Sequence, residues 1–137
     1  MSCILRISGE SLDVDALLRQ HNLPPDRSWK KGEARLFKGK AHIDSGVNFI
    51  ASDADLNEFE HQLIDATAFL ELNVTSIAKM ATTQGVQFAI LDFGIALNEG
   101  YVAQFCFFPP QLIKLLASAS VGLEISHYAC SKSESES

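Results

Sequence analysis

The stretch that decides the class of fold reads VQFAILDFGIAL (86–97), NEG (98–100) and YVAQFCFF (101–108). Two strongly apolar runs flank a three-residue connection that ends in Gly100. Such a connection is typical of a β-hairpin whose glycine takes the left-handed conformation. We therefore predict two paired strands, 86–97 and 101–108. A central hairpin favours an antiparallel or mixed sheet with helices on one face.

Further strands are predicted on both sides of this hairpin. Residues 3–8 are rich in apolar side chains and end at Gly9, and residues 121–129 are predicted as the last strand. Residues 43–51 alternate apolar and polar side chains, which is typical of a half-buried strand. Its apolar positions are Ile43, Val47, Phe49 and Ala51. A short strand is also predicted around 34–37.

The first helix is predicted to follow Asp13, which is a favoured N-cap residue. Leu12 before the cap and Leu17 four residues after it have the spacing of a hydrophobic staple. We expect this helix to end near His21, because Pro24 and Pro25 cannot continue it.

Two more helical regions are expected. Asp55 and Glu58 have capping-box spacing at the start of an apolar helical pattern. A break near Asn73 is predicted to divide that region, with a second short helix running to Gly85. The last helix is predicted to begin at residues 109–110, because proline is favoured at the first helical position.

This order of elements predicts a single α+β domain over residues 1–130. The expected architecture is a two-layer sandwich, with an antiparallel or mixed sheet and helices on one face, loosely ferredoxin-like. The 137-residue chain fits one domain. Residues 131–137 (SKSESES) are polar and low in complexity, so we expect a disordered tail.

Charge and cysteine content narrow the choice of partner and compartment. The formal net charge of −6 disfavours non-specific binding to nucleic acid or an anionic membrane, and suits a basic partner. Cys3, Cys106 and Cys130 are odd in number and lack CxxC spacing, which favours a reducing compartment. No segment has the roughly 20 apolar residues of a membrane helix, and no signal peptide is recognisable. We expect a cytoplasmic protein.

No catalytic, metal-binding or cofactor-binding motif is recognisable, so no cofactor is expected. Glu58 and His61 have the spacing of half a di-iron site, but the second half is missing and helix capping explains the acids better. Asp92 interrupts an apolar strand, where a buried acid would have a perturbed pKa. A solvated face or a bulge is the more common explanation for such a residue.

The segment 27–40 has a different composition from the rest of the chain. It holds six of the eleven Lys and Arg residues, together with the single Trp. The candidate binding residues are Arg27, Trp29, Lys30, Lys31, Arg35 and Lys38. Three interpretations stay open: a solvated loop that pairs with the chain's own acids, a docking site for a protein, or a site for nucleic acid or a small anion.

Short motifs along most of the chain resemble one family. They are LRISG (5–9), LD (12–13), LP (23–24), SWKKGE (28–33), SGVNF (45–49) and GLEIS (122–126). Their order is similar to that of the bacterial domain-of-unknown-function family 4279. The resemblance implies no established activity and no catalytic residues. It also implies that some relatives lie near toxin genes, as immunity proteins that occlude a partner would.

Three functions follow as hypotheses. The first is a non-enzymatic protein-binding domain, specifically an immunity-type inhibitor of a bacterial toxin. The alternative is a ligand- or nucleic-acid-binding regulator that uses the basic loop around Trp29. A second alternative is a small enzyme with an unrecognised pocket near Asp92. Because 101–108 is apolar on both faces, a monomer or a weak homodimer is expected.

Overall fold

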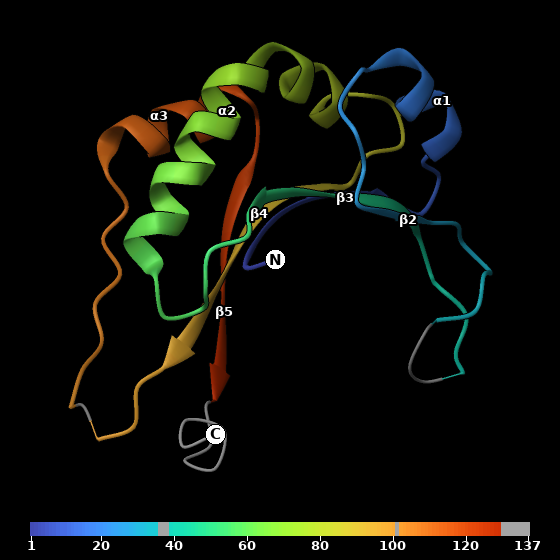
Figure 1. Cartoon of the computed structure of the whole chain (residues 1–137). Helices are drawn as coiled ribbons and strands as arrows, with labels where there is room; N and C mark the ends of the chain where they lie inside the picture. Colours follow the sequence, from blue (N-terminus) through green and yellow to red (C-terminus); the bar gives the residue numbers. More distant parts are fainter. Residues whose placement is uncertain (36–38, 101, 130–137) are drawn as a thin grey trace.

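The computed structural model describes residues 1–35, 39–100 and 102–129 of the chain. In this part the chain forms five strands and three helices (Figure 1). They are β1 (Cys3–Gly9), α1 (Val14–Gln20), β2 (Arg27–Trp29), β3 (Ser45–Ser52), α2 (Phe59–Ala81), β4 (Phe88–Leu97), α3 (Pro110–Ser118) and β5 (Gly122–Ala129). The predicted tail 131–137 lies outside the described residues.

All five strands belong to one mixed sheet in the order β2-β3-β1-β4-β5. The pairs β2–β3, β3–β1 and β1–β4 are antiparallel, and β4–β5 is parallel. The first six elements therefore follow the β-α-β-β-α-β plan of ferredoxin-like folds, and α3 with β5 extends the sheet by one parallel strand. The predicted α+β class with a mixed sheet is confirmed.

The three helices cover one face of the sheet and leave the other open (Figure 1). Alternate strand residues point to the helices, including Leu5, Phe49 and Phe93, which are fully or almost fully buried. Leu17 of α1, Leu70 of α2 and Leu112 of α3 complete this core from above. Within the described residues no helix covers the opposite face of the sheet, so the side chains on that face are available for contact with another molecule.

The start and end of α1 are confirmed. The Asp13 carboxylate accepts a hydrogen bond from the amide of Ala16 at 3.0 Å, and the helix gives way to extended backbone at His21. Leu12 and Leu17 are both buried. The cap and the apolar pair thus fix this helix over the sheet.

The predicted break in the second helix is wrong. α2 runs without interruption from Phe59 to Ala81, and the side-chain amide of Asn73 donates to the Phe69 carbonyl within it at 2.9 Å. The start is also later than the capping-box spacing predicts, although the Glu58 carboxylate does accept from the amide of Asp55 at 3.3 Å. Burial of one face of α2 on the sheet outweighs the weak helix propensity of Asn73.

The predicted hairpin is also wrong. β4 ends at Leu97 and Gly100 has a φ of 87°, so a turn does form, but residues 102–109 do not pair with β4. β5 occupies that edge of β4 instead. Phe108 packs edge-on against Phe93 at 5.2 Å between ring centroids, while Phe105 remains 89% exposed.

The strand predictions around the basic segment are confirmed in part. β3 buries Val47, Phe49 and Ala51 as predicted, but Ile43 precedes the strand and is 77% exposed. Of the short strand expected around 34–37, residues 36 and 37 lie outside the described residues; Ala34 forms an isolated bridge with Ala41, and the described residues before it form β2 at 27–29. No helix of the described residues is long and apolar enough to cross a membrane.

Candidate functional site

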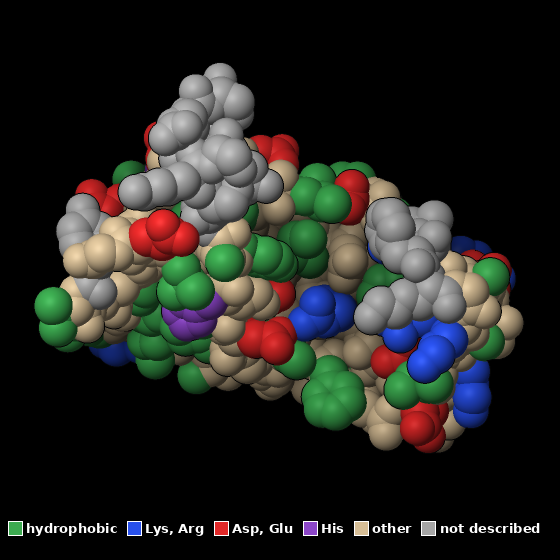
Figure 2. All heavy atoms as spheres, turned by 90° about the horizontal axis from the view of Figure 1, so that it is seen from below, with side chains coloured by type: hydrophobic (Ala, Val, Ile, Leu, Met, Phe, Trp, Pro, Cys, Tyr) green, Lys and Arg blue, Asp and Glu red, His purple; other side chains and the backbone are tan. Residues whose placement is uncertain are grey.

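The open face of the sheet carries two of the predicted binding residues. Residues opposite each other on neighbouring strands share a face. Trp29 lies opposite Gly46, and Arg27 lies opposite Asn48, which in turn lies opposite Arg6. Figure 2 looks onto this face and shows hydrophobic side chains between charged ones, with Lys and Arg gathered at the right-hand end. Arg27 and Trp29 therefore belong to the β2 end of the open sheet face.

The indole of Trp29 is held in one position by its neighbours. It rests on Gly46, where an added Cβ would lie 2.4 Å from Cζ2 of the indole, so only glycine leaves room for it. The indole N–H donates to Asp44 at 3.0 Å, and the ring stacks on His42 at 5.6 Å between centroids. Trp29 is half-buried on this face, and the core under the helices lies on the other side of the sheet. The result is a fixed aromatic surface.

Small ligands bind in hollows of roughly 300–1,000 Å³, and one hollow of this size opens beside Trp29. Its volume is 480 Å³. It is lined by Arg27, Ser28, Trp29, Glu33, Ala34 and His42. The Arg27 guanidinium lies 6.0 Å from the centroid of the indole, at the outer limit of a cation–π contact. The hollow thus combines one aromatic wall with a cation and an acid.

The remaining basic residues do not join this hollow. The Lys30 ammonium pairs with Asp15 of α1 at 2.6 Å, and the backbone amide of Lys31 donates to the Ser45 hydroxyl at 2.9 Å. Lys31 and Arg35 are exposed, and Lys38 lies outside the described residues. Of the six predicted residues, the structure brings together Arg27 and Trp29. The predicted pairing of this segment with the chain's own acids is found at Lys30.

The pairing of Lys30 with Asp15 changes the pKa of both groups, and in each case it favours the charged form. The hydrogen bond and charge of Lys30 lower the pKa of the Asp15 carboxyl, and the same contacts raise the pKa of the Lys30 ammonium. Each contact favours the charged form of its partner. Both side chains are exposed to solvent, so the pair chiefly fixes where Lys30 points.

A second charged pair on the open face was missed by the sequence reasoning. Arg6 of β1 reaches across β4 to the carboxylate of Glu124 on β5 at 2.7 Å. The two residues are 118 positions apart in sequence. The alternation in residues 3–8 places Arg6 on the solvent face, but nothing local indicates which strand supplies its partner.

Asp92 is half-buried on the same face. Its carboxylate accepts from the Ser126 hydroxyl at 2.8 and 3.0 Å. A hollow of 210 Å³ adjoins it, lined by Met1, Ser2, Ile4, Leu56, Asp92, Gly94 and Tyr128. Cys3 lies on β1 nearby but is buried, and this burial raises the pKa of its thiol, so it is not a ready nucleophile. Asp92 therefore has a hydroxyl partner and a shallow hollow.

Glu58 is the N-cap residue of α2, and His61 lies on the first turn of this helix. His61 is 4.0 Å from the Glu58 carboxylate and 3.7 Å from that of Asp65. Among residues 1–35, 39–100 and 102–129, no three His, Cys, Asp or Glu side chains come together as metal ligands would. Glu58 instead holds the turn that leads into α2 through its bond to the amide of Asp55.

These features define a class: a small α+β domain with a ferredoxin-like core, one helical layer and an open sheet face that carries a fixed tryptophan. Residues 1–130 match the model of the family described as domain of unknown function DUF4279, and the chain belongs to this family. The description of the family assigns no activity. No curated protein and no solved structure matches the chain.

Proposed function

We propose that this domain binds another protein through the open sheet face, with Trp29 and Arg27 as the main contacts. The observation that supports the proposal most is the fixed position of the Trp29 indole, which is held by its contacts with Gly46, Asp44 and His42. Trp and Arg are enriched among the residues that dominate interface energies. A side chain that is already held in place loses little conformational entropy on binding, which favours affinity.

The charge of the chain favours a basic partner. Between residues 41 and 78 there are seven Asp or Glu residues and no Lys or Arg. A partner with an excess of Lys and Arg would be attracted to the chain as a whole and would associate faster at low salt. Arg27 then lies at the rim of an acidic domain and adds selectivity rather than overall attraction.

The specific function we propose is inhibition of a bacterial toxin by occlusion. The first support is what the family resemblance implies, namely that some relatives lie near toxin genes. The fixed contact surface around Trp29 and the acidic net charge of the chain support it as well. Expression of the neighbouring gene product should arrest growth, and co-expression of this chain should restore it. Trp29→Ala should abolish the rescue, and Lys114→Ala on the helical side should not.

Two results separate the three claims made here: protein binding, inhibition of a toxin, and use of the open face as the contact surface. If the neighbouring gene product binds the chain but does not arrest growth, inhibition of a toxin is wrong and protein binding stands. If rescue is complete with Trp29→Ala, the open face is not the contact surface.

Binding of nucleic acid or a small phosphate is the second candidate, because the hollow pairs an aromatic wall with Arg27. It has less support: Glu33 lines the same hollow, and Lys30 is engaged by Asp15. Titration of Trp29 fluorescence with single-stranded DNA and with inorganic phosphate at low salt tests it. An unchanged emission spectrum would exclude both ligands.

A further inference from the structure

One half of β3 has a free edge. β3 lies between β1 and β2, but β2 pairs with it only from Gly46 to Asn48. The Asp26 amide donates to the Asn48 carbonyl at 2.8 Å, and Pro24 and Pro25 before it have no N–H to donate. In the described part of the chain no strand pairs with this edge beyond Asn48.

The orientation of the free groups follows from the alternation along a strand. The Asn48 carbonyl points to β2, so the amide and carbonyl of Ile50, two residues later, point to the same edge. An exposed pair of main-chain groups of this kind is a template for one further strand. The regular part of this free edge is short: the register with β1 shifts after Ile50, and the Ser52 carbonyl accepts from the amide of Ser2 at 3.0 Å.

A groove runs between this edge and the flank of α2. Its volume is 410 Å³ and its walls are residues 50–53 of the β3 end and Asp65, Ala68, Phe69, Leu72 and Asn73 of α2. Leu72 is 84% exposed, although it lies beside the partly buried Phe69. The exposed side chain of Leu72 and the unpaired main-chain groups of Ile50 thus line the same groove. Within the described chain neither has a partner there.

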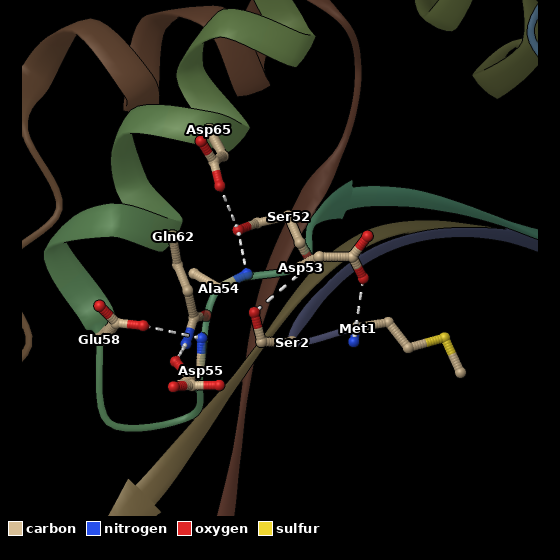
Figure 3. Close-up of polar contacts among 9 residues, drawn as sticks. All are labelled: Met1, Ser2, Ser52, Asp53, Ala54, Asp55, Glu58, Gln62 and Asp65. Atoms are coloured by element: carbon tan, nitrogen blue, oxygen red, sulfur yellow. Dashed lines mark hydrogen bonds and ion pairs between the residues drawn. The ribbon is translucent and has the colours of Figure 1, made fainter.

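The end of the groove is acidic, and its carboxylates are paired with neighbouring groups (Figure 3). The Ser52 hydroxyl donates to Asp65 at 2.7 Å and accepts from the amide of Ala54 at 3.1 Å. Asp53 lies 3.1 Å from the amine of Met1 and is exposed. No Lys or Arg lines the groove. Asp53 already has the Met1 amine as its cationic partner, so Asp65, with the imidazole of His61 at 3.7 Å, is the carboxylate that attracts a further cationic group.

We propose that this groove binds an extended basic–apolar segment of a partner protein, which adds as a short strand to β3. The strand forms main-chain hydrogen bonds with Ile50, places an apolar side chain against Phe69 and Leu72, and points a Lys or Arg two residues away toward Asp65. The spacing fits, because two strand residues span about 6.6 Å and one helical turn, from Phe69 to Asp65, spans about 5.4 Å to 6 Å.

This surface is distinct from the one around Trp29. The proposal assumes only that the domain binds protein, as inferred above, and its failure leaves the contact at Trp29 untouched. Trp29→Ala should not change binding in the groove, so the two surfaces are tested separately.

The probes are two synthetic peptides, Ac-TLTRTT-NH2 and Ac-TRTLTT-NH2, which present Leu and Arg on one face in either chain direction. Their titration into the full ¹⁵N-labelled chain is followed by NMR. One of the two should shift the amide signals of residues 49–52 in a saturable way. The amides of β5, the other edge strand of the sheet, should not move and serve as the internal control.

Matched variants identify the contacts. Leu72→Ser should weaken the peptide by about tenfold or more, since it removes most of one buried apolar side chain from the contact. Ile64→Ser, at an exposed position of α2 outside the groove, should not. Asp65→Asn should weaken binding of the peptide that contains Arg. It should not weaken binding of the same peptide with Gln in place of Arg.

The proposal is overturned if neither peptide shifts residues 49–52 at millimolar concentration, or if β5 shifts equally. Equal binding of a peptide with Glu in place of Arg, or equal weakening by Ile64→Ser and Leu72→Ser, also overturns it. Each variant is checked by its NMR spectrum without peptide, so that a misfolded variant is recognised and replaced by the milder Leu72→Ala.

Discussion

Substitution of Gly46 by alanine tests whether Trp29 is held where the structure places it. The added Cβ would lie 2.4 Å from Cζ2 of the indole and 2.9 Å from the carbonyl oxygen of Ile7. Carbon atoms in contact are normally about 3.5–4.0 Å apart, so the indole must retreat by about 1 Å or more. The retreat breaks the hydrogen bond from the indole to Asp44 and the stacking on His42.

The expected cost follows from those two contacts. A hydrogen bond contributes about 0.5–1.5 kcal/mol and an aromatic pair about as much. Gly46→Ala should therefore lower the free energy of unfolding by about 1–3 kcal/mol, which is also the usual cost of overpacking. Because Trp29 is the single tryptophan, its emission should also shift to longer wavelength as the ring becomes more exposed.

Urea unfolding followed by circular dichroism measures the stability, and Gly122→Ala is the matched control. Gly122 is also in a strand, but an added Cβ would meet nothing closer than the Ala89 carbonyl oxygen at 3.8 Å. The control should change stability by at most about 0.5 kcal/mol. In a Trp29→Ala background the clash with the indole is absent. Gly46→Ala should then lower the free energy of unfolding only by the part that comes from the close contact with the Ile7 carbonyl oxygen. Equal stability of the two alanine variants, with unchanged emission, would refute this account of the Trp29 seat.

Three further predictions concern other parts of the chain. Asp13→Ala removes the cap of α1 and should lower the free energy of unfolding by about 1 kcal/mol in urea, whereas Asp13→Asn should retain most of it. The lowered pKa of Asp15 means that its pair with Lys30 stabilises the fold above about pH 4 and that this contribution is lost as pH falls through the lowered value. Wild type and Lys30→Met should therefore differ more in stability at pH 6 than at a pH below the lowered pKa of Asp15; a constant difference would contradict the pairing. Cys3 should resist iodoacetamide in the native protein at pH 8 and react after unfolding, as measured by mass spectrometry, because burial raises the pKa of its thiol.

The parts of the fold that local sequence determines were predicted well. Asp13 as a cap, the prolines that begin α3 and the alternation of Val47 and Phe49 all rest on contacts within a few residues. The same local reasoning accounts for Gly100, whose positive φ makes a turn after β4.

The errors arise where distant residues decide. Residues 101–108 have the composition of a strand, but β5 fills the edge of β4 and Phe108 is taken up by the core beside Phe59. Asn73 is a poor helix former, yet the packing of α2 on the sheet keeps the helix whole. Neither outcome is visible in a window of neighbouring residues.

In the candidate site, too, some features follow from local sequence and others depend on residues that are distant in the chain. The composition of 27–40 predicted six candidate binding residues, of which the structure places Arg27 beside Trp29, but charge density alone did not show that Lys30 turns to Asp15. The role of Gly46 is a steric fit between two strands, and the free edge of β3 depends on where β2 ends. Both require the register of the sheet, which a single sequence does not specify.

The central claim is that the open face binds a protein through Trp29. Isothermal titration of the purified neighbouring gene product into wild type, Trp29→Ala and Lys114→Ala tests it most directly. We expect saturable binding to wild type and Lys114→Ala, and affinity lower by about tenfold or more for Trp29→Ala, a loss of about 1.4 kcal/mol or more. Equal affinity of wild type and Trp29→Ala would contradict it.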